Sequence, residues 1–250
     1  MKELPDSYRW HIQMRKETSE QEALYIARMI KFFERKLKRK YSSVLDVPCG
    51  NGRLHTFLRD SGFEIFGIDN SRELIGQARM GFPSYENSYK KANMRNFDLK
   101  RKFDMALSWF ASFGYFDDKG NLQTLKAINK HLKSSGLFFL DIPNAAHKIK
   151  SYSPIYVIED RKITEITECN IEKIKNQTYW SINQRFYGRK NNNLKFIKKI
   201  GKRVRIYTRK EITYLLKKAG FKVIKIFSSM SFDEMTSNSK QMFIVSKKIP

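Results

Sequence analysis

A chain of 250 residues, 41% of them hydrophobic, can bury a sizeable core as one large domain or as a core domain with an insertion. Two cysteines, Cys49 and Cys169, exclude a disulfide framework, and the lack of a charged-then-apolar leader or a bilayer-length apolar run favours a cytoplasmic protein without a membrane partner. The formal net charge of +24 marks a basic protein that attracts polyanions such as RNA, although a lysine-rich surface explains the same excess.

The segment 1–42 is predicted to form a helical cap. Its apolar residues recur at alternating steps of three and four, which is the spacing of one helix face. These residues are Ala23, Ile26, Ile30, Phe33 and Leu37. Basic residues crowd the end of this helix, where they suit the helix dipole and need no functional explanation.

From Ser43 onward, strand patterns alternate with helical patterns. Strands are expected over 43–47, 63–68, 85–92, 103–109 and 137–142, and helices over 53–61, 71–80 and 121–133. Repeated βα units predict a parallel sheet that is covered on both faces. We therefore expect an α/β core over residues 43–150.

The pattern changes after residue 150. Residues 155–207 alternate roughly with a period of two and carry turn signals at 191–193 and at Gly201. This alternation predicts an antiparallel β-meander, inserted into the core over residues 151–207.

The core is predicted to resume over residues 208–250. A helix over 208–219 ends before Gly220, and strands follow over 221–227 and 241–247. Because no helix separates these two strands, an antiparallel hairpin at the sheet edge is expected. The expected fold class is therefore α/β, with a doubly wound, mostly parallel seven-stranded sheet (Rossmann-like) and an inserted antiparallel β-meander.

A glycine turn follows the first predicted strand. Asp46 lies near the end of that strand, Gly50 and Gly52 form the turn, and a second acid, Asp69, ends the next strand. In an open α/β sheet the ligand lies outside the carboxyl ends of the strands, where Asp69 can accept hydrogen bonds from both ribose hydroxyls. This layout is typical of a nucleoside-binding half of a doubly wound sheet.

The turn favours S-adenosylmethionine over a dinucleotide. The dinucleotide pattern G-x-G-x-x-G needs a third glycine, whereas Gly52 is followed by Arg53, Leu54 and His55. An acid at Asp46 would sit poorly beside a pyrophosphate but suits the ammonium group of a methionine tail.

Four segments carry a resemblance to a known family. Residues 44–52 (VLDVPCGNG) are similar to motif I of the class I S-adenosylmethionine-dependent methyltransferases, and residues 66–69 (FGID) to their motif II. Residues 92–97 (ANMRNF) resemble the segment that cradles adenine, and residues 103–118 resemble the strand-four segment of a small-molecule-type subgroup with an antiparallel insert.

The resemblance implies an enzyme that uses S-adenosyl-L-methionine and releases S-adenosyl-L-homocysteine. Asp46 and Gly50 would hold the methionine moiety, Asp69 the ribose, and Asn93 with Met94 the adenine. The implied cofactor-binding residues are Asp46, Pro48, Gly50, Asn51, Gly52, Asp69, Asn70, Asn93, Met94, Ser108, Trp109 and Phe110. Pro48 and Asn93 depart from the commoner pattern, which has glycine and aspartate there.

Methyl transfer from a sulfonium is an in-line displacement, for which the protein chiefly aligns donor and acceptor. A general base is needed only if the acceptor arrives protonated, and His147 and Tyr115 are the candidates. A lone histidine or tyrosine is more often a packing or surface residue. No spacing typical of metal ligands occurs, so no metal is expected.

The insert is expected to determine the acceptor. Candidate acceptor-side residues are Tyr8, Trp10, His11, Arg185 and Tyr187. Residues 173–205 contain eleven basic residues and no acid, interleaved with aromatic residues, and this pattern suits RNA as well as a solvated strand face.

The subgroup resemblance implies methylation of an N or O atom of a small molecule. An RNA methyltransferase, and a non-catalytic RNA-binding protein of the same fold, remain alternatives. The sequence leaves open whether the protein is a monomer or a homodimer.

Overall fold

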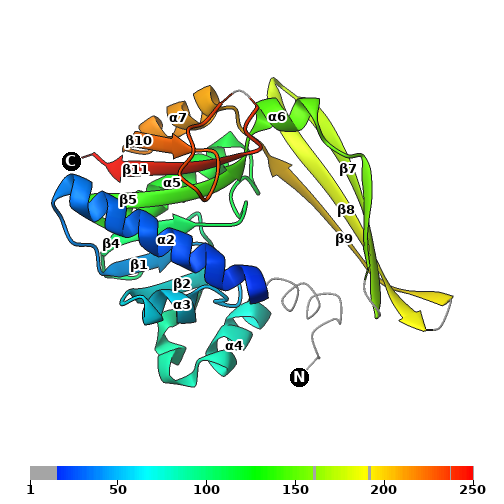
Figure 1. The fold of residues 1–250 in the computed structure, drawn as a ribbon, viewed down its shortest axis with the longest axis horizontal. Helices are drawn as coiled ribbons and strands as arrows, with labels where there is room; N and C mark the ends of the chain where they lie inside the picture. The colour runs from blue at the N-terminus through cyan, green and yellow to red at the C-terminus, as the bar shows by residue number, and fades with distance from the viewer. Residues whose placement is uncertain (1–15, 160–161, 191–192, 237, 250) are drawn as a thin grey trace.

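Residues 16–159, 162–190, 193–236 and 238–249 are described by a computed structural model (Figure 1). Within them, one seven-stranded sheet has the order β10-β11-β5-β4-β1-β2-β3, and a four-stranded sheet has the order β6-β7-β8-β9. Figure 1 shows the four-stranded sheet projecting from one side of the α/β body. The predicted fold class, an α/β core with an antiparallel insert, is confirmed.

The larger sheet is parallel except at one edge. Its parallel strands are β1 (Ser43–Asp46), β2 (Glu64–Asp69), β3 (Tyr89–Lys91), β4 (Phe103–Ser108) and β5 (Leu132–Pro143). β11 (Gln241–Lys248) runs antiparallel between β5 and the edge strand β10 (Phe221–Phe227). The predicted antiparallel hairpin at the sheet edge is therefore confirmed.

Helices pack on both faces of this sheet. The described helices are α2 (Lys16–Leu37), α3 (His55–Asp60), α4 (Arg72–Gly81), α5 (Asp118–Lys130), α6 (Ala145–Lys150), α7 (Arg209–Lys218) and the short 3-10 helix η1 (Pro83–Ser88). One buried cluster joins the sheet to α5 and α7, and another joins it to α2 and α3. None of these described helices is both long and apolar enough to span a bilayer.

Two element boundaries differ from the expected ones for local reasons. α5 begins at Asp118 rather than at residue 121, because the Asp117 side chain caps it by accepting from the Gly120 N–H. The expected strand over 85–92 is reduced to β3, because Pro83 occupies the first turn of η1, where a missing N–H is tolerated.

The insert consists of four antiparallel strands, β6 (Ile155–Glu159), β7 (Ile163–Ile174), β8 (Gln177–Lys190) and β9 (Asn193–Arg205). The turn predicted at Gly201 was wrong, because Gly201 pairs with Asn183 within the β8–β9 ladder. The β7–β8 turn uses Lys175 and Asn176, whose φ angles of 47° and 62° suit a two-residue type I′ hairpin. The turn signal at 191–193 lies partly outside the described residues.

A buried arginine joins the insert to the core. Arg205, the last residue of β9, forms ion pairs with Asp118 of α5 (3.1 Å) and Glu211 of α7 (2.5 Å). Its backbone N–H donates to the carbonyl oxygen of Gly114 (2.7 Å), in the loop after β4. A buried charge is costly unless it is paired, so these contacts favour a single position for the end of β9 against the core.

Replacing Gly114 by alanine is expected to destabilise this junction. Gly114 has a φ of +105°, and a Cβ there would lie 2.4 Å from the Arg205 carbonyl oxygen. Backbone strain and overpacking together should lower the free energy of unfolding by at least about 2 kcal/mol, measured by urea denaturation.

Gly76→Ala is the matched control for this substitution. Gly76 lies within α4, and a Cβ there would meet no atom within 4 Å. Alanine should raise the free energy of unfolding by about 0.5–1 kcal/mol because it costs less backbone entropy in a helix. Equal stability of Gly114→Ala and the wild type would contradict the rigid junction.

Candidate functional site

Two carboxylates lie at the carboxyl ends of adjacent parallel strands. Asp46 ends β1 and Asp69 ends β2, and the two strands pair with Asp46 opposite Gly67. Asp69 accepts hydrogen bonds from the Gly50 N–H (3.0 Å) and the Ser71 N–H (2.8 Å). Burial raises the pKa of Asp69, and these two N–H groups partly offset the rise. The Asp69 carboxylate therefore holds the glycine turn against β2.

The two glycines of the turn have different roles. Gly50 has a φ of +57°, and a Cβ there would meet no atom within 4 Å, so the space over this residue is open to a ligand. Gly52 has a φ of +73°, and a Cβ there would lie 2.8 Å from Oη of Tyr89. The absence of a side chain at Gly52 therefore accommodates Tyr89, whereas its absence at Gly50 leaves space for a ligand beside Asp46.

A buried histidine contacts the carboxylate of Asp46. His55 places Nε2 3.0 Å from Asp46 and stacks on Tyr89 with ring centroids 5.2 Å apart. Its Nδ1 has no hydrogen-bond partner within the described part of the chain. In a neutral imidazole one nitrogen donates, so we place the proton on Nε2, where it is donated to Asp46.

A third buried carboxylate orders the turn that follows β4. Phe110 and Ala111 have left-handed φ angles of 60° and 50°, which are unfavourable for residues other than glycine. Asp141 of β5 accepts hydrogen bonds from the Phe110 N–H (2.9 Å) and from Nε2 of Gln241 (2.6 Å). Burial raises the pKa of Asp141 to about 6. The Asp141 carboxylate thereby stabilises a strained turn.

Glu22 of α2 connects this turn with the glycine turn. Its carboxylate accepts from Nε1 of Trp109 (2.8 Å) and from Nη2 of Arg53 (2.7 Å). The Arg53 guanidinium lies 5.2 Å from the centre of the Phe110 ring. The helix predicted as part of a cap is therefore bonded to both turns of the site.

One cavity of about 850 Å³ extends from these turns to the insert. The predicted site residues that line it are Asp46, Pro48, Gly50, Asn51, Trp109, Phe110, Tyr115 and His147. The insert contributes side chains from all four of its strands, among them Glu165, Trp180 and Gln184. Trp180 is one of the aromatic residues interleaved in 173–205, whereas no sequence pattern pointed to Glu165 or Gln184.

The remaining predicted cofactor residues lie at the same sheet edge but do not line this cavity. They are Gly52, Asp69, Asn70, Asn93, Met94 and Ser108. Ser108 is buried as the last residue of β4. The side-chain oxygen of Asn93 accepts from the Arg95 N–H (3.0 Å) and so stabilises the turn after β3. Tyr8, Trp10 and His11 lie outside the described residues.

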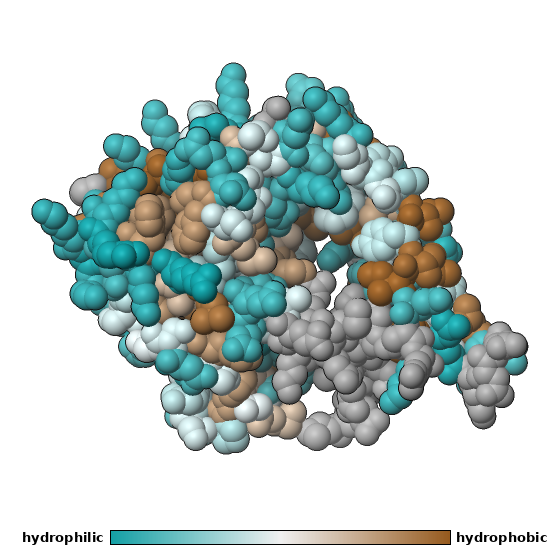
Figure 2. All heavy atoms as spheres, viewed as in Figure 1, coloured by the Kyte–Doolittle hydropathy of each residue, from teal (hydrophilic) through white to brown (hydrophobic). Residues whose placement is uncertain are grey.

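Arg185 and Tyr187 lie on the face of β8 opposite the cavity. The cavity is lined by the alternate residues of this strand, which include Gln184. Arg185 forms an ion pair with Glu168 (2.5 Å), and the Tyr187 ring packs on Phe196. Figure 2 shows apolar side chains exposed on the projecting insert, where Ile155 and Val157 of β6 are more than half exposed.

Tyr115 and His147 line the cavity from the loop after β4 and from α6. Burial raises the pKa of the Tyr115 hydroxyl, and the negative charge of Asp69 raises it further. Tyr115 is therefore protonated at neutral pH and can donate a hydrogen bond rather than act as a base. The described residues contain no group of three or more His, Cys, Asp or Glu side chains suited to a metal ion.

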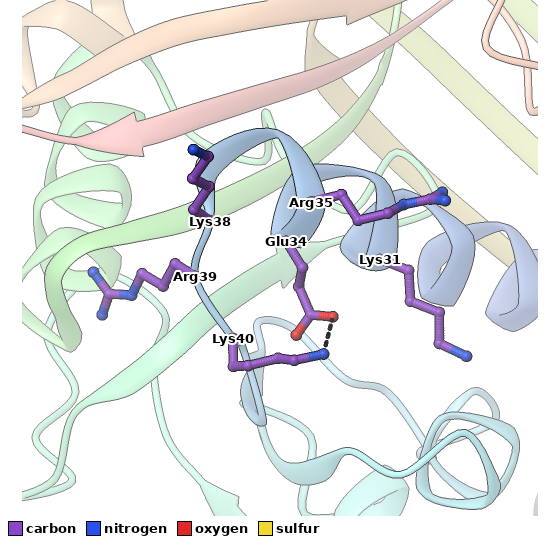
Figure 3. Close-up of a pocket in the computed structure, with 6 residues that line it drawn as sticks. All are labelled: Lys31, Glu34, Arg35, Lys38, Arg39 and Lys40. Carbon is purple, nitrogen blue, oxygen red and sulfur yellow. Dashed lines mark hydrogen bonds and ion pairs between the residues drawn. The ribbon is translucent and has the colours of Figure 1, made fainter.

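A second hollow lies away from this site. Figure 3 shows it around the end of α2, and its lining residues are Lys31, Glu34, Arg35, Lys38, Arg39 and Lys40. Lys40 forms an ion pair with Glu34 (3.5 Å). These residues immediately precede β1, so the hollow lies at the amino ends of the parallel strands, opposite Asp46.

An open α/β sheet with a glycine turn and acids at two adjacent carboxyl ends is typical of a nucleoside-cofactor enzyme. The methyltransferase-domain family matches residues 18–226 of the chain. The chain belongs to this family, and its fold is that of the class I S-adenosylmethionine-dependent methyltransferases.

Individual relatives are distant in sequence. YqeM of Bacillus subtilis, which is named as a methyltransferase, is 23% identical over 228 residues, covering 87% of this chain and 88% of YqeM. The dTDP-3-amino-3,4,6-trideoxy-α-D-glucopyranose N,N-dimethyltransferase of Streptomyces venezuelae is 31% identical over 102 residues, covering 40% of this chain and 42% of that enzyme. The structure of an S-adenosylmethionine-dependent methyltransferase from Clostridium acetobutylicum matches with a TM-score of 0.81 at 19% identity. The match covers 98% of this chain and 100% of the Clostridium chain.

The residues at the sheet edge fit S-adenosylmethionine. Open space over Gly50 allows a ligand to approach the backbone of the turn, beside a carboxylate that suits an ammonium group. Asp69 is anchored by two backbone N–H groups and keeps acceptor capacity for hydroxyl groups, since a carboxylate can accept about four hydrogen bonds.

His55→Leu removes the donor that orients Asp46. The loss of this hydrogen bond in a buried site should lower the free energy of unfolding by about 1–3 kcal/mol and weaken the binding of S-adenosylhomocysteine. Urea denaturation and calorimetry measure the two effects. His55→Gln retains an N–H donor and should recover part of both, whereas unchanged binding by the leucine variant would show that Asp46 does not depend on His55.

Asp141→Asn tests the pH dependence of the strained turn. A carboxyl whose pKa rises from 3.8 to about 6 on folding contributes stability that is present at low pH and is lost as pH rises through about 6. The free energy of unfolding of the wild type should therefore fall, relative to Asp141→Asn, by up to about 3 kcal/mol between pH 4 and pH 7. Urea denaturation at stepped pH measures this difference, and parallel profiles would contradict it.

Proposed function

We propose that the protein transfers a methyl group from S-adenosylmethionine to an N or O atom of a small molecule bound in the cavity between the sheet edge and the insert. The observation that carries this proposal is one cavity lined by Asp46 and Gly50 of the cofactor turn and by Gln184 of the insert. Its volume of about 850 Å³ lies within the range of small-molecule sites.

The relative from Streptomyces venezuelae also supports a small-molecule acceptor. Its name states that it methylates a nitrogen atom of an amino sugar nucleotide. The same reaction type, on an acceptor held by the insert, agrees with the position of the cavity here.

The residues of the sheet edge and of the cavity divide into three roles under this proposal. Asp46 and Asp69 bind the cofactor, which supplies the electrophilic methyl group. Tyr115 donates a hydrogen bond, and His147 accepts a proton when the acceptor arrives protonated. Residues 43–150 and 208–250 then form the cofactor-binding core, residues 1–42 the cap, and residues 151–207 the acceptor side.

The arrangement of the basic residues favours a small molecule over RNA. Among the described basic side chains of 173–205, Lys202 lines the cavity. Arg185 forms an ion pair with Glu168 of the neighbouring strand β7, Arg189 forms one with Glu159 of β6, and Arg205 is buried at the junction with the core. These arginines have carboxylate partners within the protein and need no phosphate.

Asp69→Ala tests the cofactor site. Loss of the carboxylate removes the ribose acceptor and the anchor of Gly50, so the affinity for S-adenosylmethionine, measured by calorimetry, should fall at least about tenfold. Asp60→Ala, at the exposed end of α3, is the matched control and should bind as the wild type does.

A methyl-transfer screen with labelled cofactor over metabolites, RNA and protein extract identifies the acceptor class. Absence of cofactor binding by the wild type would contradict the enzyme assignment. RNA labelling, or RNA affinity that falls steeply with rising salt, would instead favour the RNA alternative.

A further inference from the structure

An amino group and an indole N–H meet on the insert side of the cavity. Lys148 projects from α6, and its Nζ lies 3.9 Å from the centre of the Trp180 ring of β8. Both residues line the cavity. A lysine over an indole face is attracted by the ring, but this contact leaves the N–H groups of the ammonium available for an acceptor.

The indole N–H of Trp180 is buried without a hydrogen-bond partner in the described residues. An unpartnered buried donor costs free energy, and an indole can only donate. In the free protein this donor therefore lacks an oxygen that a ligand in the cavity can supply.

Lys148 likewise has no carboxylate within 4 Å among the described residues. Burial lowers the pKa of its ammonium group, so the charge is desolvated without a counter-ion. Two acids line the cavity. Asp46 is hydrogen-bonded to His55, and Glu165 lies opposite Phe186 in the β7–β8 strand pairing. Phe186 is six residues from Trp180 along β8, so the backbone of Glu165 lies roughly 20 Å along the strand from that of Trp180, on which Lys148 packs.

The cavity as a whole favours an anion. Its lining side chains include four cations, Arg53, Lys148, Lys202 and Lys240, against the two acids. Arg53 is paired with Glu22. Lys148 lacks a carboxylate partner and the Trp180 N–H lacks an acceptor, and oxygens that carry negative charge would supply both. A carboxylate or phosphate carries more than one oxygen and can accept from both donors, and its negative charge suits the ammonium group, which a neutral ligand does not match.

We propose that Lys148 and the indole N–H of Trp180 form the subsite for an anionic group, a carboxylate or a phosphate, on the methyl acceptor. This inference rests on the proposed function, because it assigns the cavity to the acceptor. It defines the acceptor as an acidic small molecule that presents its nucleophilic atom toward the glycine turn while its anionic end lies against α6 and β8.

The test observes the Trp180 indole directly. Protein labelled with ¹⁵N at tryptophan and saturated with S-adenosylhomocysteine is titrated with inorganic phosphate and, separately, with malonate, at constant ionic strength. The Trp180 signal is assigned by its loss in Trp180→Phe. We expect a saturable downfield shift of this indole proton with phosphate, malonate or both, and the effective anion identifies the acidic group of the acceptor.

Three variants distinguish anion binding at this subsite from nonspecific attraction by the positive charge of the protein. Lys148→Ala should weaken anion binding at least about tenfold, since it removes a charged donor, and Lys148→Arg should retain most of it. Lys150→Ala, exposed on the same helix, removes an equal charge outside the cavity and should bind anions as the wild type does. No movement of the Trp180 signal with either anion, or equal affinity of Lys148→Ala and the wild type, would overturn the proposal.

The proposed function is tested separately in the same samples. Binding of S-adenosylhomocysteine is measured by calorimetry before any anion is added. If S-adenosylhomocysteine binds normally but neither anion binds, the proposed anion subsite is wrong and the proposed methyltransferase function is not contradicted. If S-adenosylhomocysteine does not bind, the proposed function itself fails.

Discussion

The hydrogen bond from the Gly50 N–H to the Asp69 carboxylate is the contact on which the site depends. It ties the turn after β1 to the end of β2, and it is possible because the two strands are parallel neighbours whose carboxyl ends meet at one edge. The bond leaves open space over Gly50, directly beside Asp46. The same parallel pairing that forms the sheet therefore forms the proposed cofactor site.

Buried carboxylates extend this order from the glycine turn to the rest of the site. Asp46 is oriented by His55, Asp141 holds the strained turn after β4, and Glu22 joins that turn to Arg53. Each acid lies in a low-dielectric interior, where a hydrogen bond is strong and an unpaired charge is costly. A buried polar network of this kind favours one geometry of the turns, which is what alignment for an in-line transfer requires.

The insert divides its chemistry between two faces. Strand alternation directs Glu165, Trp180 and Gln184 to the cavity, and it directs Arg185 and Tyr187 to the opposite face. The Arg205 ion pairs with α5 and α7 then hold the end of β9 against the core. Together these contacts place one face of the insert over the carboxyl ends of the parallel strands, so that the proposed acceptor and cofactor sites share one cavity.

Local patterns were sufficient for the fold and for the cofactor turn. The alternation of strands and helices, the apolar face of α2 and the position of the antiparallel insert follow from periodicity, and the glycines and acids at 46–69 follow from their place at strand ends. The start of α5 was less accurate because one side chain, Asp117, decides it, and the β7–β8 turn at Lys175 and Asn176 was not predicted.

The sequence by itself determined the class of protein, because the cofactor site is built from consecutive residues around one turn and two strand ends. Only the tertiary structure decided which face of the insert meets the cavity, that His55 supports Asp46, and that Lys148 and Trp180 lie together. Lys148 and Trp180 lie far apart in the chain, the His55–Asp46 contact depends on how α3 packs beside β1, and one residue of register in a strand moves a side chain to the opposite face. The acceptor side therefore depends on packing between elements, whereas the cofactor side depends on local order.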